Sequence, residues 1–102
     1  MAMLHTVNKS PFERNALETC LSLAKKGSAI LMIEDGVIGA MQNTKYADQI
    51  AKAMDDFTFY VLTPDVSARG LKEENIIAGI KPVDYSGFVD LASEHESVQS
   101  WL

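Results

Sequence analysis

The segment 29-AILMIEDG-36 gives the clearest indication of the architecture, because an uninterrupted apolar run leads directly into a polar turn. A short apolar run bounded by turn residues is typical of a strand that is covered on both faces, as in the middle of a parallel sheet. We therefore expect residues 29–33 to form a central strand with helices packed above and below it.

Three further strands are expected: one before this segment, at residues 4–7, and two after it, at residues 57–62 and 80–83. The last of them contains Pro82, which has no backbone N–H to donate to a neighbouring strand. The segment 80–83 therefore belongs at an edge or at a strand end.

The best-marked helix start is Ser10-Pro11-Phe12-Glu13, which supplies an N-cap serine, a proline at the first helical position and a capping-box glutamate. Lys25 and Lys26 suit the negative end of a helix dipole, and Gly27 can adopt the left-handed conformation that ends a helix. These signals predict a helix over residues 11–26.

Helical signals also fill the gaps between the later strands. A short helical stretch is expected at 37–41, and Thr44 can cap a segment whose apolar residues recur at helical spacing up to Met54. Thr63-Pro64-Asp65 predicts a third short helix that closes at Arg69-Gly70. Asp84 is expected to cap a final helix that runs to about Ala92, with an apolar face formed by Tyr85, Phe88, Val89 and Leu91.

Alternation of strands with helices implies right-handed crossovers and a mainly parallel sheet. The predicted fold class is a three-layer α/β/α domain with a four- to five-stranded sheet, and residues 1–102 are expected to form a single domain. The ending Val98-Gln99-Ser100-Trp101-Leu102 is apolar for a solvated tail, so Trp101 should dock on this domain or on a neighbouring one.

Charge and hydropathy exclude several classes of function. A net charge of -5 and a pI near 4.8 oppose autonomous binding to phosphate backbones, so no direct contact with nucleic acid is expected. The N-terminus is too short and too lightly charged for a signal peptide, and no apolar run approaches the roughly 20 residues of a membrane span. The expected location is cytoplasmic, where a lone thiol stays reduced.

Cys20 is the only cysteine and the leading candidate for covalent chemistry. On a helical wheel it falls near the centre of the apolar half of the first helix, which favours burial. No lysine, arginine or histidine lies one turn away to stabilise a thiolate. Two interpretations stay open: Cys20 is a small apolar core residue, or it is a carrier of persulfide sulfur.

Other polar residues have structural explanations that compete with chemistry. His5 and His95 are the only histidines, and a Cys-His pair would have to be built by the fold. Two histidines and one cysteine are a poor basis for zinc, so neither a metal nor a cofactor is expected.

The segment 36-GVIG-39 lacks the glycine spacing and the Lys-Ser/Thr pair of phosphate-binding loops and is interpreted as a turn. Asp65 and Arg69 lie four residues apart and are expected to form a surface ion pair. Asp35 and Asp84 are interpreted as turn and cap residues.

Several stretches, taken in order, resemble the DsrH/TusB family of sulfur-relay proteins over essentially the whole chain. They are 4-LHTVNKSPF-12, 34-EDG-36, 68-ARG-70, Asp84-Tyr85, Phe88-Val89 and 98-VQSWL-102. The match looks closer to DsrH, because Cys20 falls where DsrH proteins typically carry a cysteine in their first helix.

This resemblance implies a DsrE/F-like fold and a subunit of a heterohexamer, with DsrE/TusD-like and DsrF/TusC-like partners. The principal sulfur-accepting cysteine of such a complex belongs to the DsrE/TusD-like subunit, which passes persulfide sulfur to a DsrC/TusE-like carrier. The expected function is persulfide relay during intracellular sulfur oxidation. One alternative is a TusB-like role in 2-thiolation of tRNA wobble uridine, and another is that Cys20 itself acts as a persulfide sulfurtransferase.

Overall fold

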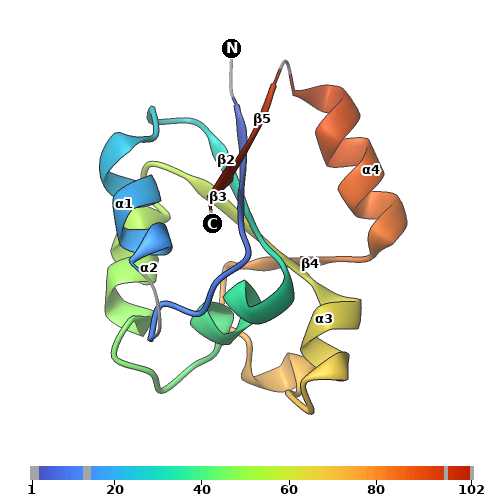
Figure 1. Ribbon diagram of the computed structural model, residues 1–102. Coiled ribbons are helices and arrows are strands. Elements are labelled where there is room, and N and C mark those ends of the chain that lie inside the picture. Colours follow the sequence, from blue (N-terminus) through green and yellow to red (C-terminus); the bar gives the residue numbers. More distant parts are fainter. Residues whose placement is uncertain (1–2, 13–14, 96, 102) are drawn as a thin grey trace.

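A five-stranded parallel sheet forms the centre of the computed structural model, which describes residues 3–12, 15–95 and 97–101 (Figure 1). The strands follow the order β4-β3-β2-β1-β5, and each neighbouring pair is parallel. Their bounds are Leu4–Val7 for β1, Ala29–Met32 for β2, Thr58–Leu62 for β3, Lys81–Val83 for β4 and Val98–Trp101 for β5. The predicted central position of the 29–33 segment is confirmed.

Helices cover both faces of this sheet, which confirms the three-layer prediction. In Figure 1, α1 (Ala16–Leu23) and α2 (Ala47–Ala53) lie on one side, and α4 (Tyr85–Glu94) lies on the other. The 3₁₀ helix η1 (Glu34–Ala40) follows β2, and α3 (Thr63–Ala68) follows β3 at the same end of the sheet. A second 3₁₀ helix, η2, spans Glu73–Asn75.

Strand β2 shows why the apolar run predicted this architecture. All its residues are buried, and they alternate between two hydrophobic clusters. Ile30 and Met32 belong to the larger cluster, which includes Cys20 of α1 and Ile50 of α2, whereas Ala29 and Leu31 belong to a smaller cluster with Leu91 of α4. A strand with both faces buried has no polar positions to alternate with.

Helix α1 is shorter than predicted at both ends. The Ser10 hydroxyl does accept a hydrogen bond from the Phe12 backbone N–H at 3.2 Å, but regular helix begins at Ala16. Glu13 of the expected capping box lies outside the described residues. The helix ends at Leu23 because Ala24 is already extended (ψ 145°), and Gly27 has its positive φ (91°) in the following turn.

The C-terminal segment forms a fifth strand, so the interpretation of residues 80–83 as the last strand is wrong. Strand β5 pairs with β1, in register from Leu4 opposite Val98 to Val7 opposite Trp101. The Trp101 side chain packs against the larger hydrophobic cluster. Trp101 therefore docks on this domain, one of the two predicted outcomes, while Leu102 lies outside the described residues.

Strand β4 and helix α4 match their predictions in most respects. β4, with Pro82, is an edge strand, as expected. The Asp84 side chain caps α4 by accepting a hydrogen bond from the Gly87 N–H at 2.8 Å. The predicted apolar face is wrong in part: Leu91 is buried, but Tyr85 and Val89 are 60% and 67% exposed.

Candidate functional site

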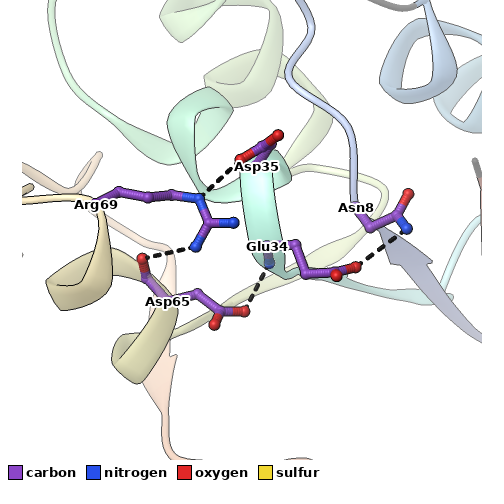
Figure 2. Close-up of polar contacts among 5 residues, drawn as sticks. All are labelled: Asn8, Glu34, Asp35, Asp65 and Arg69. Carbon is purple, nitrogen blue, oxygen red and sulfur yellow. Dashed lines mark hydrogen bonds and ion pairs between the residues drawn. The ribbon is translucent and has the colours of Figure 1, made fainter.

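Five polar residues gather where three parallel strands end, which is the edge of an open α/β sheet at which ligand sites usually form. Asn8 follows β1, Glu34 and Asp35 begin η1 after β2, and Asp65 and Arg69 come from the α3 segment after β3 (Figure 2). The fold thus brings 34-EDG-36 and 68-ARG-70 together, although they lie far apart in the sequence.

The predicted ion pair between Asp65 and Arg69 is wrong, because Arg69 reaches a different carboxylate. Its Nε lies 2.9 Å from Oδ1 of Asp35, and its Nη1 donates only to the backbone carbonyl of Asp65, at 3.3 Å. The Asp65 carboxylate instead accepts a hydrogen bond from the Glu34 backbone N–H at 2.6 Å (Figure 2). The helical spacing of Asp65 and Arg69 allows their side chains to pair. In the folded chain, however, the Arg69 guanidinium binds Asp35 and the Asp65 carboxylate binds the Glu34 N–H.

These contacts hold the start of η1 in place. Glu34 has a positive φ of 51°, a conformation that is uncommon for a residue with a side chain. Its N–H is bound by Asp65, and its carboxylate accepts a hydrogen bond from Asn8 Nδ2 at 3.1 Å. The cluster links the segments that follow β1, β2 and β3, because Asp35 pairs with Arg69, the Glu34 carboxylate binds Asn8 and the Asp65 carboxylate binds the Glu34 N–H. Sequence reasoning found the two motifs but had no signal for their contact.

Among residues 3–12, 15–95 and 97–101, no three or more histidine, cysteine, aspartate or glutamate side chains are grouped so as to hold a metal ion.

Cys20 lies in the middle of α1 with no exposed surface, inside the larger hydrophobic cluster. Burial raises the pKa of its thiol to about 12, because an apolar environment disfavours the charged thiolate. A thiol must ionise and reach its target to attack a donor persulfide. In this structure of the single chain, Cys20 meets neither condition.

The two histidines are both engaged in hydrogen bonds. The indole Nε1 of Trp101 donates to His5 Nδ1 at 3.0 Å, so this imidazole is neutral and carries its proton on Nε2. Burial lowers the pKa of His5. His95, at the end of α4, donates from Nδ1 to the Leu91 carbonyl at 2.7 Å, so it belongs to the opposite side of the sheet from α1.

Comparison with known proteins identifies the family. The family model described as DsrH like protein matches residues 9–98. Protein TusB of Pectobacterium parmentieri is 37% identical over 100 residues, covering 97% of this chain and 100% of that protein. The chain belongs to the DsrH/TusB family. Protein TusB of Shigella flexneri, another relative, is 34% identical over 99 residues, with 97% and 100% of the two chains covered.

Two solved structures with much lower sequence identity share the fold of this DsrH/TusB chain. The YchN protein of Escherichia coli superposes with a TM-score of 0.81 at 12% identity, covering 99% of each chain. MTH1491 of Methanobacterium thermoautotrophicum superposes with a TM-score of 0.73 at 12% identity, covering 96% of this chain and 97% of its own. Both show the predicted α/β architecture and carry no information on function.

None of the helices formed by the described residues is both long and apolar enough to cross a bilayer.

Proposed function

We propose that this chain is a TusB-type subunit of a cytoplasmic sulfur relay that serves 2-thiolation of the wobble uridine in tRNA. The observation that carries this proposal is the full-length match to relatives named Protein TusB, at 34% to 37% identity and without a missing segment on their side. This assignment reverses the order of the two pathways expected from the sequence, where the first-helix cysteine favoured sulfur oxidation.

The role within the relay is that of an accessory subunit beside TusC-like and TusD-like chains in a heterohexamer, with a TusE-like protein as the next sulfur carrier. Two features of the chain support an accessory role. The only thiol is buried with a raised pKa, and both imidazoles are occupied by hydrogen bonds. The net charge of -5 means that the tRNA is held by another protein.

The proposed pathway is tested by complementation of an Escherichia coli strain that lacks its own TusB. Production of this chain should restore 2-thiouridine in tRNA, measured by mass spectrometry of digested nucleosides. A production level matched to the native subunit and an empty vector are the controls. If 2-thiouridine stays absent although the chain is folded and joins the resident TusC and TusD, the thiolation assignment is wrong.

Intracellular sulfur oxidation is the second candidate, favoured by the match to a family model described as DsrH like protein. An experiment in the source organism distinguishes the two pathways. Deletion of the gene should lower tRNA 2-thiouridine under the first proposal and should slow oxidation of stored sulfur under the second.

A persulfide-carrier role for Cys20 is a further proposal, motivated by its being the only cysteine. In that step the Cys20 thiolate attacks the terminal sulfur of a donor persulfide. A new S–S bond forms on Cys20, and the donor thiolate leaves with the electron pair of the broken bond. The burial of Cys20 means that assembly with partner chains would have to open α1 first.

Intact-mass analysis of the assembled complex after incubation with a persulfide donor tests this role. A carrier gains sulfur on this chain, and Cys20→Ala abolishes both the gain and the transfer. Undiminished transfer by a complex that contains Cys20→Ala would leave the chain an accessory subunit only.

A further inference from the structure

The C-terminal strand β5 is attached to the domain by few side chains. It lies at one edge of the sheet, where β1 is its only partner among the described strands. Its residues 98–100 are exposed, and Trp101 is the one that packs against the larger hydrophobic cluster. The attachment of β5 therefore depends strongly on how the Trp101 side chain is held.

His5 of β1 holds the Trp101 side chain from the neighbouring strand. The indole Nε1 donates to His5 Nδ1 at 3.0 Å, and the two ring centroids lie 6.1 Å apart. His5 is in register with Gln99, so the bond runs diagonally across the β1–β5 pair. Because His5 is only 4% exposed, water has little access to replace the indole as its partner.

This hydrogen bond exists only in the neutral state of His5. An indole nitrogen is a donor and never an acceptor, and an imidazolium donates from both of its ring nitrogens. Protonation of His5 Nδ1 therefore sets two N–H groups against each other in a place that water reaches poorly. A buried charge without a partner is unfavourable, so the protonated state favours movement of the indole away from His5.

The described surroundings of His5 supply no charge that would stabilise an imidazolium. Ile30 of β2 and Gln99 of β5 flank it in the sheet. Helix α1 packs on this side of the sheet, where its buried face carries the Cys20 thiol, and its charged residue, Glu18, is exposed. Neither side chain forms a hydrogen bond or an ion pair with His5.

We propose that the His5–Trp101 hydrogen bond is a latch, and that protonation of His5 releases β5 from β1 before the rest of the sheet unfolds. The other four strands keep their own pairing, since β1 stays bonded to β2. The hydroxyl pair of Thr6 and Ser100, at 3.2 Å, also joins β1 to β5 but does not titrate. The pH dependence of the attachment therefore comes from the latch.

The size of the effect follows from proton linkage. In the released state the imidazole is exposed and titrates near its ordinary pKa of 6.5, whereas burial lowers the pKa of docked His5. The released state therefore binds more protons, and the equilibrium constant for release rises as pH falls below about 6.5. One such group changes this constant by at most about tenfold per pH unit, so release should increase by up to about tenfold between pH 7.5 and 5.5.

Two backbone amides report on the two sides of β1. The Leu4 N–H donates to the Ser97 carbonyl at 3.1 Å, next to β5, and the Ile33 N–H donates to the Val7 carbonyl at 3.0 Å, at the β2 side. Hydrogen exchange at both amides, measured by NMR and corrected for the intrinsic rate, gives their protection. The Leu4 amide should be the less protected at every pH, and its protection should fall by up to about tenfold between pH 7.5 and 5.5.

Two variants connect the release to the hydrogen bond. His5→Gln keeps a side-chain carbonyl that can accept from the indole but does not titrate, so protection of the Leu4 amide should no longer depend on pH. Trp101→Phe removes the indole N–H but keeps an aromatic ring. Protonation of His5 then opposes no second donor, and the pH dependence should weaken. Circular dichroism establishes that each variant is folded.

A pH dependence at the Leu4 amide that is present in the wild type and absent in His5→Gln supports the latch. Equal protection of the Leu4 and Ile33 amides would mean that β5 leaves only when the whole sheet unfolds, which overturns the proposal. An unchanged pH dependence in His5→Gln overturns it as well, because another group then drives the release. If His5→Gln does not fold, a dependence in Trp101→Phe as steep as in the wild type contradicts the latch.

Discussion

At the scale of single residues, the chain places its most reactive side chain where it is least able to react. Cys20 is the only thiol, yet it fills the space between α1 and the sheet like an alanine or a valine. The sequence already favoured this outcome, since the apolar half of the helical wheel is centred near Cys20. Local sequence could not tell whether partner chains open this layer, because that depends on surfaces of other proteins.

Cys20 should react slowly with thiol reagents in the folded single chain. With a pKa of about 12, roughly one thiol in ten thousand is ionised at pH 8, against about one in ten for an ordinary cysteine of pKa 9.0. We expect modification by a chromogenic disulfide reagent to be about a thousandfold slower in buffer than in denaturing urea. Equal rates in the two solvents would show that the thiol is accessible in the native chain.

His5 should make stability depend on pH. Its pKa is lowered from the ordinary value of 6.5, because burial disfavours the imidazolium, and a protonated Nδ1 would face the Trp101 N–H. Below about pH 6.5 the unfolded chain therefore binds more protons than the folded one, and the free energy of unfolding falls as pH falls. The slope from one such group is at most about 1.4 kcal/mol per pH unit.

Urea unfolding between pH 5.5 and 7.5 measures this slope. His5→Gln should flatten the profile in this range. An identical slope for wild type and His5→Gln would assign the pH dependence to other groups.

At the scale of elements, the order of strands and helices follows from the sequence, and the long-range pairings do not. Apolar runs, helix caps and Pro82 predicted four strands and their neighbours, since each signal acts within a few residues. β5 was missed because four residues carry too little periodicity, and its partner β1 lies at the other end of the chain. The Asp35–Arg69 ion pair was missed because its two partners also lie far apart in the sequence.

Gly36 of η1 lies so close to the backbone at the end of β1 that no side chain should be tolerated there. A Cβ added there would overlap the carbonyl oxygen of Val7, which already accepts a hydrogen bond from the Ile33 N–H. Because backbone and not a flexible side chain is in the way, Gly36→Ala should lower the free energy of unfolding by about 3 kcal/mol or more.

Gly70→Ala is the matched control for this substitution. Gly70 has a positive φ of 69° but nothing within 4 Å of the added carbon, so only the conformational cost of about 1 kcal/mol applies. Chemical denaturation of both variants gives the comparison. If the two substitutions cost the same, the close approach of η1 to β1 does not constrain the native state.

At the scale of the whole molecule, the sheet divides the interior into two unequal parts. The larger hydrophobic cluster joins buried residues of α1, α2, η1 and α3 to the strands, whereas the smaller one holds α4 through Leu91 and a few partly buried neighbours. Elements with few buried apolar contacts open at lower free energy than the rest of a protein. Helix α4 is therefore the part of the described chain that should separate most readily from the sheet.

Substitutions in the larger cluster should destabilise the whole domain, whereas those in the smaller cluster should mainly loosen α4. Phe59→Ala removes a 1% exposed ring from the larger cluster and should cost about 3–5 kcal/mol, a large share of the stability of a small domain. Leu91→Ala removes a 6% exposed side chain that attaches α4, so its main effect should be local opening. Native-state hydrogen exchange distinguishes the two effects, since Leu91→Ala should speed exchange of the α4 amides while those of β2 keep their protection. Uniformly faster exchange across the sheet in Leu91→Ala would mean that α4 and the larger cluster unfold as one unit.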